Sequence, residues 1–316
     1  MARKSKNKQA RQPVRWKKVG SKIWSDRFMY MMALPVVIYF FIFKYLPMGW
    51  LRIAFYDFKI LKGFEGSKFV GFDNFKLFLS NPDFGQILWN TVWLNVLNLA
   101  FVFTAPILFA LLLNEISKRK FKRVVQTISY LPHFLSMVVV TSMITTFLSP
   151  SLGIVNSMIK MLGGDAIHFL GEPQYFRMVM IVSGIWQGIG WGSVIYLSAL
   201  TGIDQEQYEA AVVDGATRFQ QIRHITFPGI KNTIAIMLIL QIGNLLSVGF
   251  EKVYLLQNAQ NMGISEVLST YVYKMGMQNS NYSLATAVGL FNSIISFGLV
   301  LFANRMSKKY SETSLM

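Results

Sequence analysis

Six long apolar runs alternate with short polar segments along the chain. A membrane-spanning helix needs about 20 mostly apolar residues, and each run is close to that length. The pattern therefore predicts an all-α, polytopic membrane protein with six transmembrane helices. The predicted spans are Phe28–Met48, Trp89–Leu113, Val124–Leu148, Phe176–Leu200, Ile230–Phe250 and Leu284–Ala303.

The first apolar run follows a basic arm, as the apolar core of a signal peptide would. The run is too long for such a core, and no small-residue cleavage site follows it. We therefore treat it as a retained span. This divides the chain into a basic N-terminal arm (1–27), a six-span domain (28–304) and a C-terminal tail (305–316).

Composition supports placement in lipid. Hydrophobic residues make up 53% of the chain and charged residues 15%, whereas soluble domains carry about 25% charged residues. The net charge of +16 admits a basic soluble protein as an alternative, but most of the charge lies beside the apolar runs, as in a membrane flank. The chain has no cysteine, which excludes disulfides, zinc–cysteine clusters and thiol catalysis.

The distribution of Lys and Arg predicts the orientation in the membrane. Of the 31 Lys and Arg residues, 21 lie in the N-terminal arm, the loop after the second span, the loop after the fourth span and the C-terminal tail. Six crossings place all four of these segments on one side. Basic loops mark the cytoplasmic side, so we expect both termini in the cytoplasm and segments 49–88, 149–175 and 251–283 outside.

The most polar segment in the second half of the chain is "EAAVVDGATRFQQIRHITFP", Glu209–Pro228. Asp204 is a good N-cap for a preceding helix, with Gln207 at the capping-box position. Gly215 is suited to the left-handed conformation that ends a helix. Pro228 suits the first turn of the next span. The segment therefore predicts a helix, a sharp glycine turn and a second short helix before the membrane.

The second short helix, Ala216–Ile225, is amphipathic. Phe219, Ile222 and Ile225 recur at positions i, i+3 and i+6, so they are predicted to share one face. Two interpretations fit this pattern. The helix either lies at the lipid interface or docks into another protein.

The same segment resembles the EAA loop of permease subunits in binding-protein-dependent ABC importers. That pattern is Glu-Ala-Ala, three residues, Gly, nine residues, Ile, one residue and Leu-Pro. Phe227, where leucine is usual, is the only departure. In that family the loop sits in a cleft of a cytoplasmic ATPase. The resemblance assigns a coupling loop of about 201–229 to this chain, with Glu209, Ala210, Ala211, Asp214, Gly215, Phe219, Ile222, Ile225 and Pro228 as its key residues.

The resemblance extends over about Phe28 to Arg305, and the basic arm lies outside it. Stretches such as "FKYLPMGWLRIAFYDF", "LLLNEISKRKFKRVVQTISYLPHFLS" and "SGIWQGIGWGSVIYLSALTGID" are similar to the branch that imports complex oligosaccharides and polysaccharide fragments. It implies the type I ABC importer permease fold in a bacterial inner membrane. The implied partners are a second homologous permease, two ATPase subunits, an extracytoplasmic substrate-binding protein and the oligosaccharide.

The chain itself carries no ATP-binding motif. "GFEGSK" at Gly63–Lys68 lacks the spacing of a Walker A loop and lies on the predicted outer side. We therefore expect no catalytic residue and no cofactor in this chain, with ATP and Mg²⁺ bound by the partner ATPase.

Other candidate chemistry is sparse. The three histidines, His133, His168 and His224, are not at metal-ligand spacing from one another or from carboxylates, so no metal site is expected. The glycines of "WQGIGWG", Trp186–Gly192, could suggest a phosphate loop. In a membrane span, such glycines more often permit close helix packing.

A substrate path through the membrane needs aromatic faces and mid-span amides. Polar groups in a span either face such a path or form hydrogen bonds between helices. The candidates are Trp186, Gln187, Trp191, Gln241, Asn244 and Asn292.

Two further classes of membrane protein were weighed against an ATP-driven permease. An ion-coupled secondary transporter places ionisable groups within its spans, and the predicted spans are almost free of them. Inverted repeats are also not visible. An intramembrane enzyme would need a polar catalytic cluster, which the spans lack.

Overall fold

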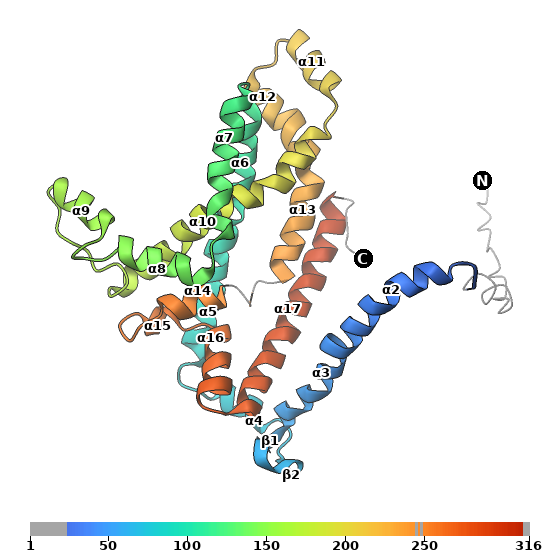
Figure 1. Ribbon diagram of the computed structural model, residues 1–316, viewed down its shortest axis with the longest axis vertical. Helices are drawn as coiled ribbons and strands as arrows, with labels where there is room; N and C mark the ends of the chain where they lie inside the picture. Colours follow the sequence, from blue (N-terminus) through green and yellow to red (C-terminus); the bar gives the residue numbers. More distant parts are fainter. Residues whose placement is uncertain (1–23, 244–245, 247–248, 312–316) are drawn as a thin grey trace, which may run out of the picture. The chain divides into compact units, whose positions relative to one another are not determined.

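A computed structural model describes residues 24–243, 246 and 249–311 (Figure 1). Most of the predicted basic arm, the path candidate Asn244 and the last five residues lie outside the described residues. The chain forms two compact units, Met1–Arg52 and Ile53–Met316, and each is described by itself.

The first unit is an apolar helix that begins at Arg27. It consists of α2 (Arg27–Phe40), a π-helical turn η1 (Phe41–Tyr45) and α3 (Leu46–Met48). A 3₁₀ segment, η2 (Gly49–Phe55), follows and crosses the boundary between the units. None of the apolar residues in α2, η1 or α3 is buried, so their surface is available to lipid or to another subunit.

The second unit begins with a small hairpin that the all-α prediction did not include. Strands β1 (Tyr56–Lys59) and β2 (Gly63–Phe69) are antiparallel, with Tyr56 opposite Phe69. Ser283 accepts a hydrogen bond from the backbone N–H of Phe58 at 2.8 Å, which ties the hairpin to the start of the last helix.

The remaining elements are helical and follow the hairpin in chain order. They are η3 (Ile60–Lys62, between the strands), α4 (Asp73–Leu79), α5 (Phe84–Leu97), η4 (Asn98–Val102), α6 (Thr104–Glu115), α7 (Arg119–Tyr130), η5 (Leu131–Phe134), α8 (Met137–Phe147), α9 (Ile154–Met161), α10 (Pro173–Thr201), α11 (Gln205–Val213), α12 (Arg218–Gln221), η6 (Ile222–Thr226), α13 (Phe227–Gly243), α14 (Phe250–Leu256), α15 (Met262–Ser265), α16 (Leu268–Tyr273), η7 (Lys274–Gln278) and α17 (Tyr282–Ser311).

In the part of the chain that the structure describes, five helical stretches are long and apolar enough to cross a membrane. They are Arg27–Phe55, Phe84–Glu115, Pro173–Thr201, Arg218–Gly243 and Tyr282–Lys308. A sixth crossing is present if the bent pair α7–α8 counts as one span. The six-span architecture predicted from the apolar runs is therefore compatible with the structure. The last helix continues through Ser311, past the predicted start of the tail at Arg305.

The third predicted span, Val124–Leu148, is not a straight helix. Its two halves meet at an angle of 102° (Figure 1). Pro132 lies in the 3₁₀ turn η5 that ends the first half, and Leu135 and Ser136 are then extended, with ψ of 139° and 150°. Ser136 then caps the next helix and accepts a hydrogen bond from the N–H of Val139. Hydrophobicity alone does not detect such a bend.

The fifth predicted span, Ile230–Phe250, is also different in the structure. The helix ends at Gly243, and a new helix starts at Phe250 after Gly249, whose φ is 68°. At its other end the helix begins at Arg218, twelve residues earlier than predicted. The span is therefore shifted toward the polar segment and interrupted where the prediction continued it.

Glycines in α10 allow close helix crossings, as the sequence predicted. A Cβ on Gly190 would overlap the backbone carbonyl of Ser129 in α7. A Cβ on Gly192 would lie 2.9 Å from the ring of Pro106 in α6. By contrast, a Cβ on Gly188 meets nothing within 4 Å. These contacts support a packing role for the glycines.

Three buried apolar clusters hold the second unit together. One joins α8, α10 and α14, another joins α4, α5, α16 and α17, and the third joins α6, α10 and α13. The third cluster lies next to the polar segment and contains Ile203 and Ile230, which flank that segment in the sequence.

Replacing Gly190 by Ala is expected to destabilise the protein, whereas Gly188→Ala is expected to be neutral. The added methyl group at residue 190 has no space against Ser129, and overpacking of this kind costs about 1–3 kcal/mol. Thermal unfolding in detergent measures the effect. Equal melting temperatures for the two variants would contradict a close crossing at Gly190.

The orientation can be tested with single cysteines, because the chain has none of its own. Leu61 is fully exposed in the predicted outer segment, and Lys308 is exposed near the end of the last helix. We expect Leu61→Cys to react with an impermeant thiol reagent on intact cells, and Lys308→Cys to react only after permeabilisation. The opposite labelling pattern would reverse the topology.

Candidate functional site

The predicted coupling loop forms a hairpin of two helices at one end of the second unit (Figure 1). Asp204 caps α11 by accepting a hydrogen bond from the N–H of Glu206 at 3.0 Å. The helix ends at Val213, and Gly215, two residues later, has a φ of 75°. The N–H of Ala216 reaches the carbonyl of Ala211, and that of Gly215 reaches Val212, as in a Schellman motif. The predicted N-cap and glycine turn are both present.

The second helix of the hairpin differs from the prediction. Thr217 caps it through a reciprocal capping box with Gln220, and the helix begins at Arg218. It then continues without a break through a π-helical turn and past Pro228 to Gly243. The expected separate helix Ala216–Ile225 is therefore wrong. Pro228 lies near the start of α13, directly after the π turn, and does not end the preceding helix.

The apolar triplet of this segment does not form one docking face. Phe219 is 71% exposed, but Ile222 is half-buried and Ile225 packs against the cluster around Ile203 and Ile230. The π turn explains the difference, because it changes the angular spacing between residues on either side of it. The exposed apolar side chains at the tip of the hairpin are instead Val212, Val213 and Phe219, of which Val213 is 87% exposed.

Side-chain contacts fix the hairpin to the spanning helices. The hydroxyl groups of Tyr208 and Thr226 lie 2.9 Å apart, and Thr226 is buried. The amide of the buried Gln221 donates to the carbonyl of Ala216 at 3.2 Å. These bonds hold α11 at a defined angle to the helix that follows it.

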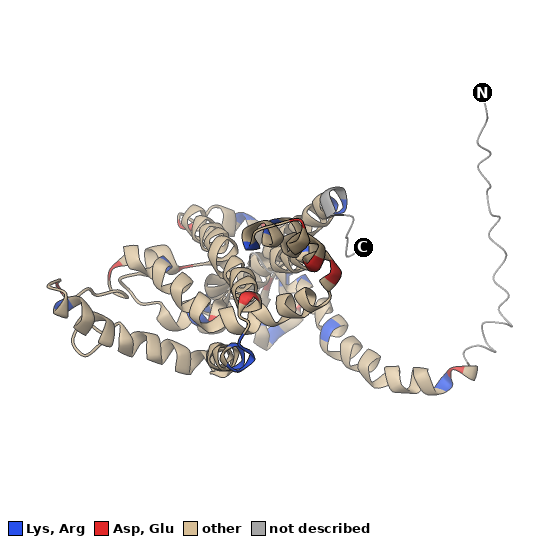
Figure 2. Ribbon diagram, turned by 90° about the horizontal axis from the view of Figure 1, so that it is seen from above, with Lys and Arg blue, Asp and Glu red and all other residues tan. Residues whose placement is uncertain are grey.

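The EAA residues themselves lie on the surface of α11. Glu209, Ala210 and Asp214 are exposed, and Ala211 is half-buried. Glu209 has no hydrogen-bond partner among the residues that the structure describes. Figure 2, which looks onto this end, shows the acidic residues of α11 in red and the basic start of α7 in blue. The carboxylates of α11 are thus open to a partner.

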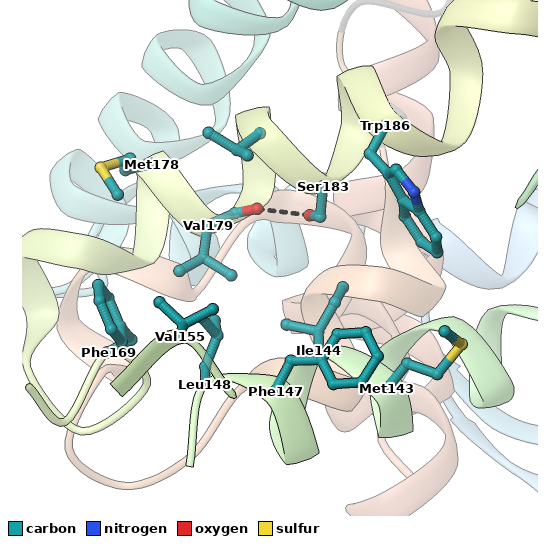
Figure 3. Close-up of a pocket in the computed structure, with 11 residues that line it drawn as sticks. Met143, Ile144, Phe147, Leu148, Val155, Phe169, Met178, Val179, Ser183 and Trp186 are labelled. Carbon is teal, nitrogen blue, oxygen red and sulfur yellow. Dashed lines mark hydrogen bonds between the residues drawn. The ribbon is translucent and has the colours of Figure 1, made fainter. Parts of the chain in front are cut away.

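The three α10 candidates for a substrate path separate onto two faces. Trp186 lines a cavity of about 380 Å³ between α8, α9 and α10 (Figure 3). The other lining side chains are apolar except Ser183, whose hydroxyl already donates to the carbonyl of Val179. This cavity offers no free polar group to a sugar hydroxyl, so it fits an apolar occupant better.

The other face of α10 carries an amide and an aromatic side chain. Gln187 and Trp191 are four residues apart and therefore neighbours on the helix. The indole of Trp191 stacks on the imidazole of His133, with ring centroids 4.9 Å apart and an interplanar angle of 8°. His133 lies at the bend between α7 and α8. Its sequence position gave no sign of a place in the path, because the bend that brings it to Trp191 is not visible in the hydropathy pattern.

A second polar region lies where the fifth span is interrupted. The amide of Asn292 in α17 donates to the carbonyl of Leu246 at 3.4 Å. The Asn292 carbonyl oxygen and the Ser296 hydroxyl, one turn later, are buried without a hydrogen-bond partner in the described part of the chain. Gln241 lies in the last turn of α13 and is half-buried. Asn244 lies outside the described residues.

Lys252, in α14 just after the interruption, was not singled out from the sequence. It is 5% exposed and has no ion-pair or hydrogen-bond partner among the described residues. Burial lowers the pKa of Lys252 to about 8. Burial of a lysine side chain without a partner disfavours its charged form, which is the cause of the lowered pKa. The described residues contain no group of three His, Asp or Glu side chains suited to a metal ion.

Comparison with known proteins identifies close relatives. Residues 103–311 match the family model described as binding-protein-dependent transport system inner membrane component. Protein LplB of Bacillus subtilis (strain 168) is 46% identical, over 92% of this chain and 91% of the relative. YteP of the same organism, a polygalacturonan/rhamnogalacturonan transport system permease protein, is 44% identical, over 95% of this chain and 93% of the relative.

A solved structure is similar over nearly the whole chain. It is a bacterial alginate ABC transporter in complex with a periplasmic protein that holds an alginate pentasaccharide. The similar chain in it is 42% identical and superimposes with a TM-score of 0.87, over 93% of this chain and 99% of that one. A second structure of a bacterial ABC transporter, involved in the import of the acidic polysaccharide alginate, gives the same values.

Proposed function

The chain belongs to the family of binding-protein-dependent transport system inner membrane components, and we propose that it forms half of the membrane path of an ATP-driven importer for oligosaccharides or polysaccharide fragments. The observation that carries this proposal is the match over residues 103–311 together with permease relatives that cover most of the chain. The substrates named for those relatives, polygalacturonan, rhamnogalacturonan and alginate, support the substrate class.

The proposed assembly contains a second related permease, two ATPase subunits and an extracytoplasmic binding protein. The solved alginate transporter includes such a periplasmic protein, which supports the last of these. The apolar helix that begins at Arg27 has no buried residues within its own unit, so a partner permease has a surface to cover there. ATP and Mg²⁺ belong to the partner ATPase, since the sequence has no Walker A loop.

The hairpin formed by α11 and α12 is the proposed contact with the ATPase. Its exposed apolar tip, Val212, Val213 and Phe219, is the kind of surface that a protein cleft covers. The capped ends and the Tyr208–Thr226 bond keep that tip in a fixed orientation. The helix from Arg218 to Gly243 then connects the contact directly to the interruption in the membrane.

The proposed path for the sugar uses the polar faces of α10, α13 and α17. Trp191 and His133 supply a stacked aromatic pair, Gln187 lies one turn before Trp191, and Asn292 supplies a carbonyl without a partner among the described residues. Such mid-span polar groups are rare in lipid unless they face a cavity or a neighbouring helix. The apolar surroundings of Trp186 make it a weaker candidate than Trp191.

Two substitutions in the hairpin test the coupling proposal. Val213→Asp adds a charge to the apolar tip, and Gly215→Val places a β-branched residue where φ is 75°. We expect each variant to insert in the membrane and to pair with the second permease, but to retain the ATPase at least tenfold less well in co-purification. Val213→Ile is the matched control and should retain it fully.

Glu209→Ala is expected to have a milder effect than Gly215→Val, because Glu209 has no hydrogen-bond partner within the described chain. If both Val213→Asp and Gly215→Val retain the ATPase and normal substrate-stimulated hydrolysis, the hairpin is not the coupling element.

A further inference from the structure

An aromatic cluster at the predicted outer side contains none of the residues of the proposed path. Phe250 and Tyr254 are one turn apart on α14, and their rings stack with centroids 5.7 Å apart. Tyr273, at the end of α16, stands against both rings, with centroids 5.0 Å from Phe250 and 4.9 Å from Tyr254. Three rings from two separate helices thus meet directly after the interrupted span.

The exposure of these rings distinguishes them from the packed aromatic residues of the core. Phe78 and Tyr271, which belong to a buried cluster, are 2% and 7% exposed. Phe250, Tyr254 and Tyr273 are all half-buried, so part of each ring remains accessible. A cluster that served only to pack α14 against α16 would be expected to bury its rings as the Phe78 cluster does.

Polar groups border the accessible side of the cluster. The amide of Gln278 donates to the hydroxyl of Tyr254 at 2.9 Å, and Gln278 is exposed. This bond leaves the Gln278 carbonyl oxygen available as an acceptor. The Tyr273 hydroxyl has no hydrogen-bond partner in the segments that the structure describes.

The backbone places Gln278 beside the rings by an unusual conformation. In an α-helix, residues five apart point about 140° away from each other. The π-helical turn from Lys274 to Gln278 forms i→i+5 bonds, which brings residues 273 and 278 toward the same face. Ser280, two residues later, has a φ of 54°, a conformation costly for a residue other than glycine. The π turn and the positive φ of Ser280 thus both lie in the segment that follows Tyr273.

We propose that Phe250, Tyr254, Tyr273 and Gln278 form an outer carbohydrate subsite, which holds one sugar ring of the oligosaccharide before it enters the membrane path. The proposal rests on the proposed function. Aromatic faces pack against the C–H groups of a sugar ring, and a few fixed amide and hydroxyl groups at the rim orient its hydroxyls. This combination of accessible rings and free polar groups is present at the cluster.

The test measures sugar binding by the assembled transporter without its binding protein. The complex of this chain, its partner permease and the ATPases is placed in lipid nanodiscs. Alginate pentasaccharide and a galactooligosaccharide are the probes, and saturation-transfer NMR reports direct contact with the sugar. We expect Tyr273→Ala to weaken binding of the probe that the wild type binds by about tenfold, because it removes the ring that faces both others.

Two controls separate a binding role from a structural one. Tyr273→Phe keeps the ring and should stay within about threefold of the wild type. Phe72→Ala removes an exposed ring from another aromatic group in the predicted outer segment, Phe55, Phe72 and Phe75, and should leave binding unchanged. Assembly with the ATPase should be normal in all three variants.

The outcomes distinguish the subsite from the proposed function. If Tyr273→Ala binds the probe as the wild type does, or if the wild type imports a probe but does not bind it without the binding protein, the subsite is wrong and the cluster is packing or a contact with the lipid interface. If the wild type neither binds nor imports either probe, the oligosaccharide-importer function is contradicted for these two sugars.

Discussion

Backbone hydrogen bonding in lipid is the constraint on which this structure depends. In the hydrocarbon region each N–H and C=O needs a partner within the protein, so a chain crosses as helix unless a neighbour or a cavity satisfies the groups it exposes. Among the described residues, the structure leaves the helix between α7 and α8, at Leu135 and Ser136, and again at Leu246 and Gly249. At the first, His133 stacks on Trp191, and at the second, Asn292 donates to Leu246. Polar side chains of the spans thus lie at both of these places.

The same constraint explains how the hairpin is connected to the membrane part of the proposed transporter. One helix runs from Arg218 at the hairpin to Gly243 at the interruption. At 1.5 Å per residue, its 26 residues extend about 39 Å. Because Ile225 and Ile230 are packed in the cluster near α6 and α10, a displacement of the hairpin acts on packed side chains as well as on a continuous helix. The π turn from Ile222 to Thr226 lies between these parts and is the place where the helix departs from regular geometry.

The sequence was sufficient for the features that depend on local chemistry. Apolar runs predicted the spans, Asp204 predicted a cap and Gly215 predicted a left-handed turn, because each follows from residue type and spacing. The bend between α7 and α8 and the early start of the fifth spanning helix at Arg218 were not predicted, because hydropathy does not show the direction of a helix or its polar extension. The faces of Trp186, Trp191 and Ile225 also depend on π turns, bends and tertiary packing, which are invisible in a pattern of fixed period. The coupling roles of the hairpin residues remain predictions.

The placement of charge bears on the source of energy for transport. Among the candidate spans in the described chain, Glu115 is the only carboxylate, and it lies at the end of its span, 3.9 Å from Arg218. The half-buried carboxylate of Glu266 lies outside those spans and is held by Lys274, Gln257 and Thr270. A proton- or cation-coupled carrier needs an ionisable group that exchanges partners within the membrane. No carboxylate of the described spans is placed to do so, which agrees with the proposed ATP-driven import. The capped hairpin, with its exposed apolar tip, is the proposed contact for a separate ATPase.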